Sequence, residues 1–185
     1  MQLLVVTKEG SMRRSEQRRG MAWLVVALLM VGGLSGRALA ADPQVGNWTG
    51  GVGIGMIGNT PDGTALGLNF NAERFMDQHV SLGPLVQLGF TGDLTQVGVS
   101  GQAKYWIDLP DPKLKLNFQG GIGFVHADMR GASDTSFLVP IGVGLDYKVS
   151  DTFAVTSNFM LNFTDLSVAG HRTTVMPAFT VGFRF

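Results

Sequence analysis

The amino-acid sequence predicts an all-β fold, an eight-stranded antiparallel up-and-down transmembrane β-barrel preceded by a cleaved signal peptide. Three observations lead to this prediction. Apolar residues recur at every second position along most of residues 47–185, which is the period of a β-strand. Turn residues interrupt the pattern about every 10 to 20 positions. The alternation continues to the last residue, where Phe179, Phe183 and Phe185 share one face.

Residues 1–40 have the features of a signal peptide, and we expect them to be removed. Four arginines, at positions 13, 14, 18 and 19, precede the apolar run 21–34, and Ala38 and Ala40 supply the small-x-small pattern of a cleavage site. We place the cut after Ala40, with Met12 as the alternative start of translation. The run is short and interrupted by glycine, which disfavours the alternative of a membrane anchor.

The expected mature chain, residues 41–185, is long enough for one domain and carries a net charge of about −4. This charge argues against nucleic acid as a partner. The sequence contains no cysteine, which excludes disulfide bonds and thiolate metal sites. Its three histidines, at positions 79, 126 and 171, are scattered along the chain, so we expect no metal and no other cofactor.

The first four predicted strands each set an apolar face against a small or polar one. In the second, for example, Leu66, Leu68 and Phe70 alternate with Gly67 and Asn69. The four strands are expected at residues 47–57, 65–73, 80–90 and 96–107, with connections at 59–63, 75–79 and 91–94.

The last four strands repeat the alternation, and their connections differ in length. These strands are expected at 114–124, 137–148, 153–164 and 178–185. The connections after the second, fourth and sixth strands are short, whereas 126–134 and 165–172 are expected to be longer loops. Short periplasmic turns and longer outer loops are typical of outer-membrane barrels, and this topology places both termini on the periplasmic side.

Alternation alone does not say which face points outward, because a small soluble barrel with an apolar interior has the same pattern. The apolar phase of the predicted strands carries no charge, as lipid requires, since a lipid-facing Arg or Lys near the midplane costs about 2–4 kcal/mol. The polar phase is mostly Gly, Asn, Gln, Ser and Thr, which is too few charges for a surface in water. The ionisable strand residues, all expected to face inward, are Glu73, Lys104, Lys115, Asp146, Lys148 and Arg184.

The signal peptide, the eight alternating strands, the Gly-rich segments "GGIGF" and "IGVGLDYKVSD" and the terminal "GFRF" together resemble the small bacterial outer-membrane β-barrel family of OmpA/OmpX type. The resemblance covers essentially the whole mature chain, with no second domain expected. It implies location in the outer membrane, contact with its lipid and lipopolysaccharide, and recognition of the C-terminal aromatic strand by the barrel-assembly machinery. Phe183 and Phe185 would form that signal, although Thr180 stands where the family often has Gly.

An eight-stranded barrel is just wide enough for side chains to fill its interior. The inward charges gather toward the periplasmic half, where we expect opposite charges to pair and plug the lumen. A proton or ion path, as in a very narrow low-conductance channel, is the alternative.

Few residues point to chemistry. Barrels that resemble lipid A deacylases use a His-x-Ser-Asn segment, but Asp128 is the residue two after His126, and His171 also lacks this spacing. No catalytic residue is therefore predicted, and a deacylase-like enzyme remains an alternative to a structural or cell-surface role. Arg130 and Arg172, in the two longest expected loops, are candidates to meet lipopolysaccharide phosphates or are solvated loop charges. No protein partner is predicted.

Overall fold

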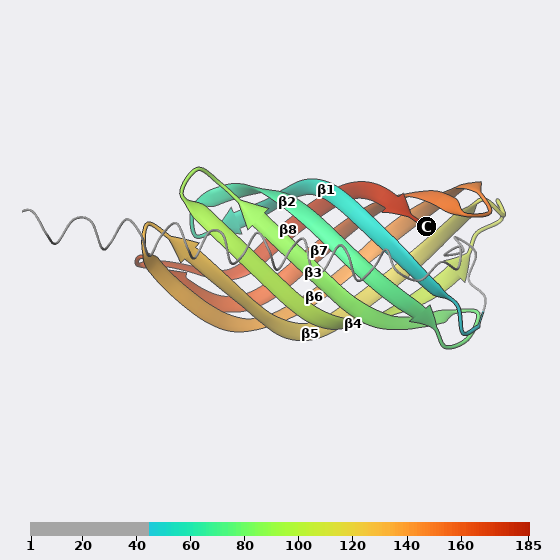
Figure 1. Ribbon diagram of the computed structural model, residues 1–185, viewed down its shortest axis with the longest axis horizontal. Coiled ribbons are helices and arrows are strands. Elements are labelled where there is room, and N and C mark those ends of the chain that lie inside the picture. The colour runs from blue at the N-terminus through green and yellow to red at the C-terminus, as the bar shows by residue number, and fades with distance from the viewer. Residues whose placement is uncertain (1–44) are drawn as a thin grey trace, which may run out of the picture. The chain divides into compact units, whose positions relative to one another are not determined.

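The structure is a computed structural model that describes residues 45–185 as one closed barrel of eight antiparallel strands in sequence order (Figure 1). The strands are β1 (Trp48–Thr60), β2 (Gly63–Phe75), β3 (Val80–Phe90), β4 (Leu94–Asp108), β5 (Leu114–Met129), β6 (Ala132–Ser150), β7 (Phe153–Val168) and β8 (His171–Arg184). The predicted fold class is confirmed. The expected signal peptide, its cleavage after Ala40 and the start at Met12 lie outside the described residues. No helical segment within 45–185 has the length and apolar character to reach across a bilayer.

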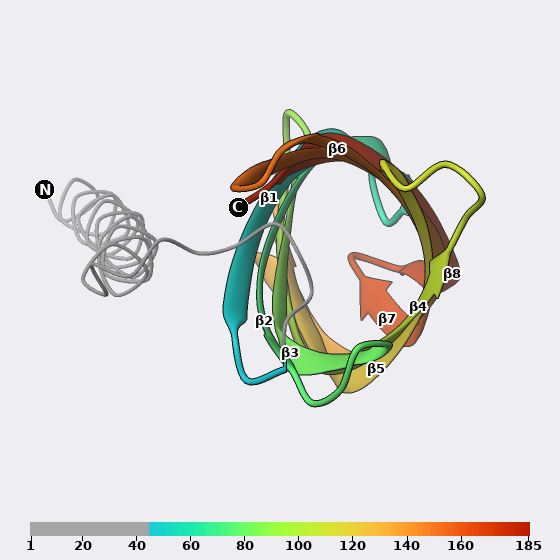
Figure 2. The same cartoon turned by 90° about the vertical axis from the view of Figure 1, so that its right-hand side faces the viewer.

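The strands run diagonally across the barrel (Figure 1) and close into a ring (Figure 2), and their register measures how steeply they tilt. Following paired residues once around from Trp106 leads back to β4 at Gln96, ten residues along the same strand. The path runs through Asn117, Gly144, Asn158, Thr180, Gly55, Gly67 and Gly89. A stagger of this size over eight strands corresponds to a tilt of about 40° and to a narrow interior.

The outward face of the strands carries an apolar band between two levels of aromatic rings. Phe153 and Phe163 both face outward and lie ten residues apart on β7. At about 3.3 Å per residue and a tilt of about 40°, this is about 25 Å along the axis, the height of the apolar band of a membrane barrel. Phe153 also stacks on Phe183, with 5.1 Å between ring centroids. Exposed side chains of the band include Ile54, Met56, Leu66, Ile122, Ile141, Phe159, Phe179 and Val181.

Outward-facing charge is present at the strand ends, where β2 and β7 extend beyond the predicted strands 65–73 and 153–164. Arg74 alternates with the buried Glu73 and Phe75 and is exposed on the outside of β2, where it pairs in register with Trp48. At the other end, Asp165 is exposed on the outside of β7, beyond Phe163. Both charges lie at or beyond a level of aromatic rings. The outward face is therefore free of charge only in the band between the two aromatic levels.

Segments 126–134 and 165–172 are not the longer loops that we expected. β5 and β6 continue until only Arg130 and Gly131 connect them, and β7 and β8 are connected by Ala169 and Gly170 alone. The φ angles are 52° and 51° at Arg130 and Ala169 and 87° and 84° at the two glycines. Positive φ at both central residues defines the type I′ hairpin turn. The prediction of longer loops at this end is therefore wrong, because sheet pairing forces Arg and Ala into a conformation that they disfavour.

The strained turn at Ala169 yields a stability prediction. We expect Ala169→Asn to raise the free energy of unfolding by about 0.5–1 kcal/mol, because Asn tolerates positive φ better than Ala. Urea unfolding of the refolded barrel in detergent measures the change. The control is Thr152→Asn in the two-residue β6–β7 turn, where neither residue has a positive φ. An equal gain in both variants would contradict the turn assignment.

Candidate functional site

The lumen is the candidate site, and β4 shows how its character changes from one end to the other. Inward positions along β4 begin with Leu94, pass through Ser100 and Gln102, and end with Lys104 and Trp106, all of them buried. One end of the lumen is therefore apolar, its middle carries amides and hydroxyls, and its other end is ionic and aromatic. We call the group formed by Glu73, Lys104, Asp146 and Arg184 the ion cluster.

Glu73 on β2 is the fully buried anion of the ion cluster. Its Oε1 lies 2.5 Å from Nζ of Lys104 and also accepts a hydrogen bond from the Asn71 amide. Its Oε2 accepts a hydrogen bond from the Ser81 hydroxyl at 2.7 Å. Three donors from β2, β3 and β4 thus replace the water that this carboxylate loses on burial.

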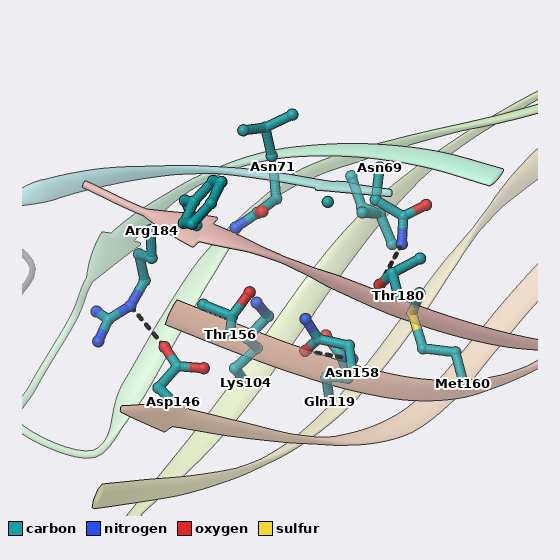
Figure 3. Close-up of a pocket in the computed structure, with 15 residues that line it drawn as sticks. Asn69, Asn71, Lys104, Gln119, Asp146, Thr156, Asn158, Met160, Thr180 and Arg184 are labelled. Atoms are coloured by element: carbon teal, nitrogen blue, oxygen red, sulfur yellow. Dashed lines mark hydrogen bonds and ion pairs between the residues drawn. The ribbon is translucent and has the colours of Figure 1, made fainter. Parts of the chain in front are cut away.

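The second ion pair joins Arg184 on β8 to Asp146 on β6 (Figure 3), with 2.7 Å from Nε to Oδ2. The Arg184 guanidinium also lies over the Trp106 ring, 4.7 Å from its centroid, a favourable cation–π geometry. Trp106 donates its indole N–H to Ser81 at 2.9 Å and packs against Phe75, with 5.8 Å between centroids. Trp106 and Ser81 therefore link the two ion pairs into one network.

Trp106 is the residue that the sequence analysis missed. It stands between Tyr105 and Ile107, so its phase is that of the inward, polar positions. An aromatic residue at an inward position could have identified Trp106, because a large side chain that faces a narrow lumen must fill part of it.

The charges of the two ion pairs sum to zero, and this balance offsets the free-energy cost of burying them. Two cations and two anions lie together, and each of the four side chains is less than a tenth exposed. Each pair also reaches past an intervening strand, from β2 to β4 across β3 and from β6 to β8 across β7. Compensation therefore depends on the closed ring rather than on neighbours in the sequence.

Lys115 and Lys148 were predicted to join the cluster, but the structure places their ion pairs at the rim. Nζ of Lys115 lies 2.9 Å from Asp108, whose side chain is 68% exposed. Nζ of Lys148 lies 3.0 Å from Asp151, which is 94% exposed. Both lysines are close to strand ends, where water is available to the ammonium group.

The middle of the lumen holds amides and little space. Asn69 donates to the Thr180 hydroxyl at 3.3 Å, and Gln119 donates to Asn158 at 3.4 Å (Figure 3). The cavity that these side chains line with Lys104, Asp146 and Arg184 has a volume of about 20 Å³, room for about one water molecule. Gly144 leaves room for these amides, since a Cβ there would lie 2.4 Å from Oδ1 of Asn158 and the amide side chain would have to move.

The other predicted residues lie outside the lumen. Arg130 and Arg172 are exposed and bound to carboxylates, with 2.5 Å from Arg130 to Asp93 and 2.7 Å from Arg172 to Asp165. Phe183 and Phe185 are exposed on the outside of the barrel. His126 contacts the Thr135 hydroxyl at 2.8 Å on the exposed face of β5 and β6. Among residues 45–185, no three His, Asp or Glu side chains gather closely enough to hold a metal ion.

Comparison with solved structures shows which proteins share this fold. Neisserial surface protein A (NspA) matches with a TM-score of 0.56 and 14% identity over 74% of this chain and 94% of that chain. The N-terminal β-barrel domain of OprF from Pseudomonas aeruginosa matches at 0.51 and 16%, over 77% of this chain and 100% of that domain. Ail, the attachment invasion locus protein of Yersinia pestis, in complex with the heparin analogue sucrose octasulfate, matches at 0.52 and 13%, with coverage of 77% and 100%.

No protein-family model and no curated protein sequence matches the chain. At these identities the solved structures establish a shared fold, that of the small eight-stranded outer-membrane barrels.

Removing one charge from the ion cluster should lower the free energy of unfolding far more than removing one charge from an ion pair at the rim. We expect Glu73→Gln to lower the free energy of unfolding by about 3–5 kcal/mol, because it leaves buried cations uncompensated. The double variant Glu73→Gln/Lys104→Met should recover most of this loss. Tryptophan fluorescence during urea unfolding in detergent provides the measurement.

The control for the ion cluster is Asp108→Asn, which removes the exposed partner of Lys115. We expect it to cost less than about 1 kcal/mol. Equal losses for Glu73→Gln and Asp108→Asn would show that the cluster is not a buried, charge-compensated unit.

Proposed function

We propose that this chain, which has the fold of the small bacterial outer-membrane β-barrels, is an integral outer-membrane protein with a plugged lumen and a structural or cell-surface role. It would be exported through the periplasm by its signal peptide and inserted by the barrel-assembly machinery, which would act on the strand that carries Phe183 and Phe185. Outer-membrane lipid and lipopolysaccharide would then surround the apolar band.

The observation that carries this proposal is the contrast between the two faces of one sheet. The outer face exposes a continuous band of aliphatic and aromatic side chains, which a water-facing surface does not tolerate at this size. The inner face is filled by ions, amides and buried apolar side chains, and the cavity among them has a volume of about 20 Å³. A barrel that is apolar outside and filled inside fits a bilayer and leaves no open aqueous path.

The charge at the outer end favours a structural role over binding of sulfated sugars, the kind of ligand present in the Ail complex. Arg130 and Arg172 are each engaged by an aspartate. The turns and strand ends around them are predominantly acidic, with Asp62, Asp93, Asp128, Asp134 and Asp165. A polyanion would have to displace these carboxylates, so we place Arg130 and Arg172 as ion-paired stabilisers of the hairpin tips. The deacylase alternative gains no support from His126, which contacts Thr135.

The two tryptophans of the barrel test its orientation in a membrane. Trp48 is 49% exposed on the outside, and Trp106 is 2% exposed in the lumen. In liposomes with brominated acyl chains, we expect strong quenching of Trp48 in the Trp106→Phe variant. Quenching of Trp106 in the Trp48→Phe variant should be several-fold weaker. Equal quenching of both, or a mature chain that stays in solution without detergent, would contradict a lipid-facing outer surface.

The plugged lumen has its own test in planar lipid bilayers. We expect the refolded chain to produce no stable single-channel steps, because ions and packed side chains fill the interior. A larger porin reconstituted in the same way is the positive control. Reproducible conductance steps of one size would replace the plugged barrel with the narrow-channel alternative.

A further inference from the structure

The outer half of the β7–β8 hairpin is separated from the strands on both sides of it. Register pairs between β6 and β7 end at Val139–Phe163, although both strands continue beyond this point. Register pairs between β8 and β1 end at Ala178–Ile57, next to Pro177, which has no N–H to donate. The hairpin therefore leaves the backbone ladder of the ring while its own two strands stay paired up to Val168–His171.

Side chains take the place of the missing backbone pairs. The N–H of Asp165 donates to the Ser136 hydroxyl at 3.0 Å, and the N–H of Ser167 donates to Oδ2 of Asp134 at 2.7 Å. We call these two bonds the clip. On the other side, the Asn59 amide donates to the carbonyl of Val175 at 2.7 Å.

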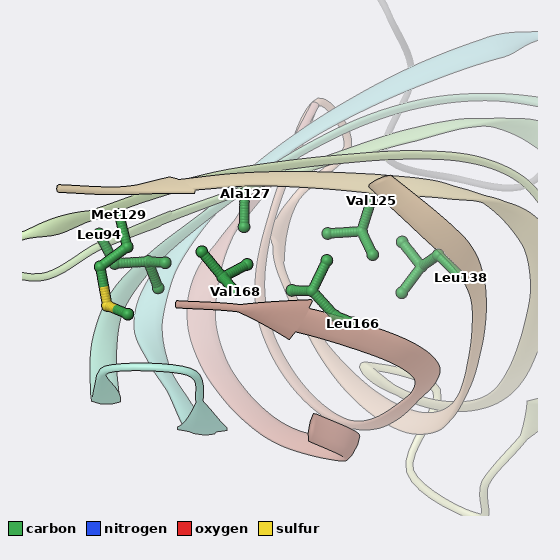
Figure 4. Packing of buried hydrophobic residues seen from close by; sticks show 7 residues of the cluster. All are labelled: Leu94, Val125, Ala127, Met129, Leu138, Leu166 and Val168. Carbon is green, nitrogen blue, oxygen red and sulfur yellow. The ribbon is translucent and has the colours of Figure 1, made fainter. Parts of the chain in front are cut away.

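The freed hairpin bends over the mouth of the barrel. The pairing of β7 with β8 shifts register between Phe163 and Leu166, and such a bulge bends a strand. Figure 2 shows the end of β7 lying inside the ring of strands. Leu166 and Val168 consequently face Val125 and Ala127 of β5 (Figure 4). We call the resulting cluster the apolar cap; its members, none more than 5% exposed, are Leu94, Val125, Ala127, Met129, Leu138, Leu166 and Val168.

Between the apolar cap and the ion cluster, the lumen contains buried polar atoms that have no hydrogen-bond partner in the protein. They include Ser100 Oγ and Gln102 Nε2 on β4, Gln87 Nε2 on β3 and Asn69 Oδ1 on β2. Each such atom costs about 1–3 kcal/mol unless water satisfies it. The middle of the lumen therefore holds polar atoms that favour water, next to a second buried apolar cluster. The members of that cluster are Ile57, Ala65, Leu85, Met160, Met176 and Ala178. At the level of the apolar cap, apolar side chains from four strands meet and exclude water.

We propose that the outer half of the β7–β8 hairpin is a lid and that its apolar cap, rather than the ion cluster, is the barrier that keeps water and ions out of the lumen. A constriction lined by apolar side chains blocks ions by excluding water, whereas charged side chains attract it. The ion cluster lies where neighbouring strands are paired in register, but the lid is tied to β6 through the clip. This inference rests on the closed lumen proposed above.

A cysteine inside the lumen provides the test, because the sequence contains no other cysteine. Ser100 is 3% exposed and lies on β4 between Leu94 of the cap and Lys104 of the ion cluster. Ser100→Cys in the refolded barrel in liposomes is treated with a small, charged, water-soluble methanethiosulfonate. We expect slow modification in the otherwise unchanged barrel.

Two variants open the lid in different ways. Asp134→Ala/Ser136→Ala removes the clip and leaves all seven residues of the apolar cap in place, and Leu166→Ser/Val168→Ser makes the cap polar. We expect either pair of changes to accelerate modification of Ser100→Cys at least tenfold. Glu73→Gln/Lys104→Met, the matched change in the ion cluster, should alter the rate less than twofold.

The outcomes separate the lid from the closed lumen. Heat-modifiable gel migration first establishes that each variant is folded, and if the polar cap variant does not fold, the clip variant decides. The proposal that the hairpin is a lid would be wrong if the folded lid variants left the rate of modification of Ser100→Cys unchanged. It would also be wrong if the ion-cluster variant accelerated modification as much as they do. Modification of Ser100→Cys at the rate of a free thiol, before any further change, would instead refute the closed lumen.

Discussion

Seven register pairs between β1 and β8, from Gly51–Arg184 to Ile57–Ala178, turn an eight-stranded sheet into a ring. Along these seven pairs neither β1 nor β8 has a free edge, so this part of the outer surface can be apolar without leaving backbone polar groups unpaired. Glycine allows the close approach, since a Cβ on Gly55 would lie 1.9 Å from the carbonyl oxygen of Phe179 and one on Gly182 would lie 2.0 Å from that of Val52.

Closure of the seam also completes the electrostatics of the lumen. Arg184 is the last residue of β8, and its side chain is the partner of Asp146 and one of two cations that lie over the Trp106 ring, the other being Lys104. Without β8 in place, Asp146 and Trp106 would face the interior with no guanidinium between them. The β1–β8 pairs and the Asp146–Arg184 ion pair therefore both require β8 to be in place in the ring, which couples closure of the barrel to the stability of its interior.

The end of the barrel that carries the Arg130 and Ala169 turns is built from strands rather than loops, which changes the kind of surface that it offers. Two-residue turns at Arg130–Gly131 and Ala169–Gly170 leave long, paired hairpins with little irregular chain. Asp93 and Asp165 bind the exposed arginines, and Asp134 serves the clip. Charges at this end thus pair with one another within and between hairpins, in keeping with the structural role proposed above.

The sequence by itself determined the class of fold, the number of strands and the face on which most side chains lie. Period two is a local property, so the inward placement of Glu73, Lys104, Asp146 and Arg184 followed from alternation alone. Only the tertiary structure decided which cation meets which anion, since each pair spans an intervening strand and depends on the stagger of the ring.

The two loops were mispredicted for the same reason, because their conformation depends on pairing between strands and not on local sequence. Arg130 and Ala169 disfavour positive φ, and only cross-strand pairing holds them there. The sequence analysis also placed Leu166 and Val168 in the expected loop 165–172 and did not reveal their partners. Their contact with Val125 and Ala127 joins residues about 40 positions apart, and it exists because the β6–β7 ladder ends and the hairpin bends inward.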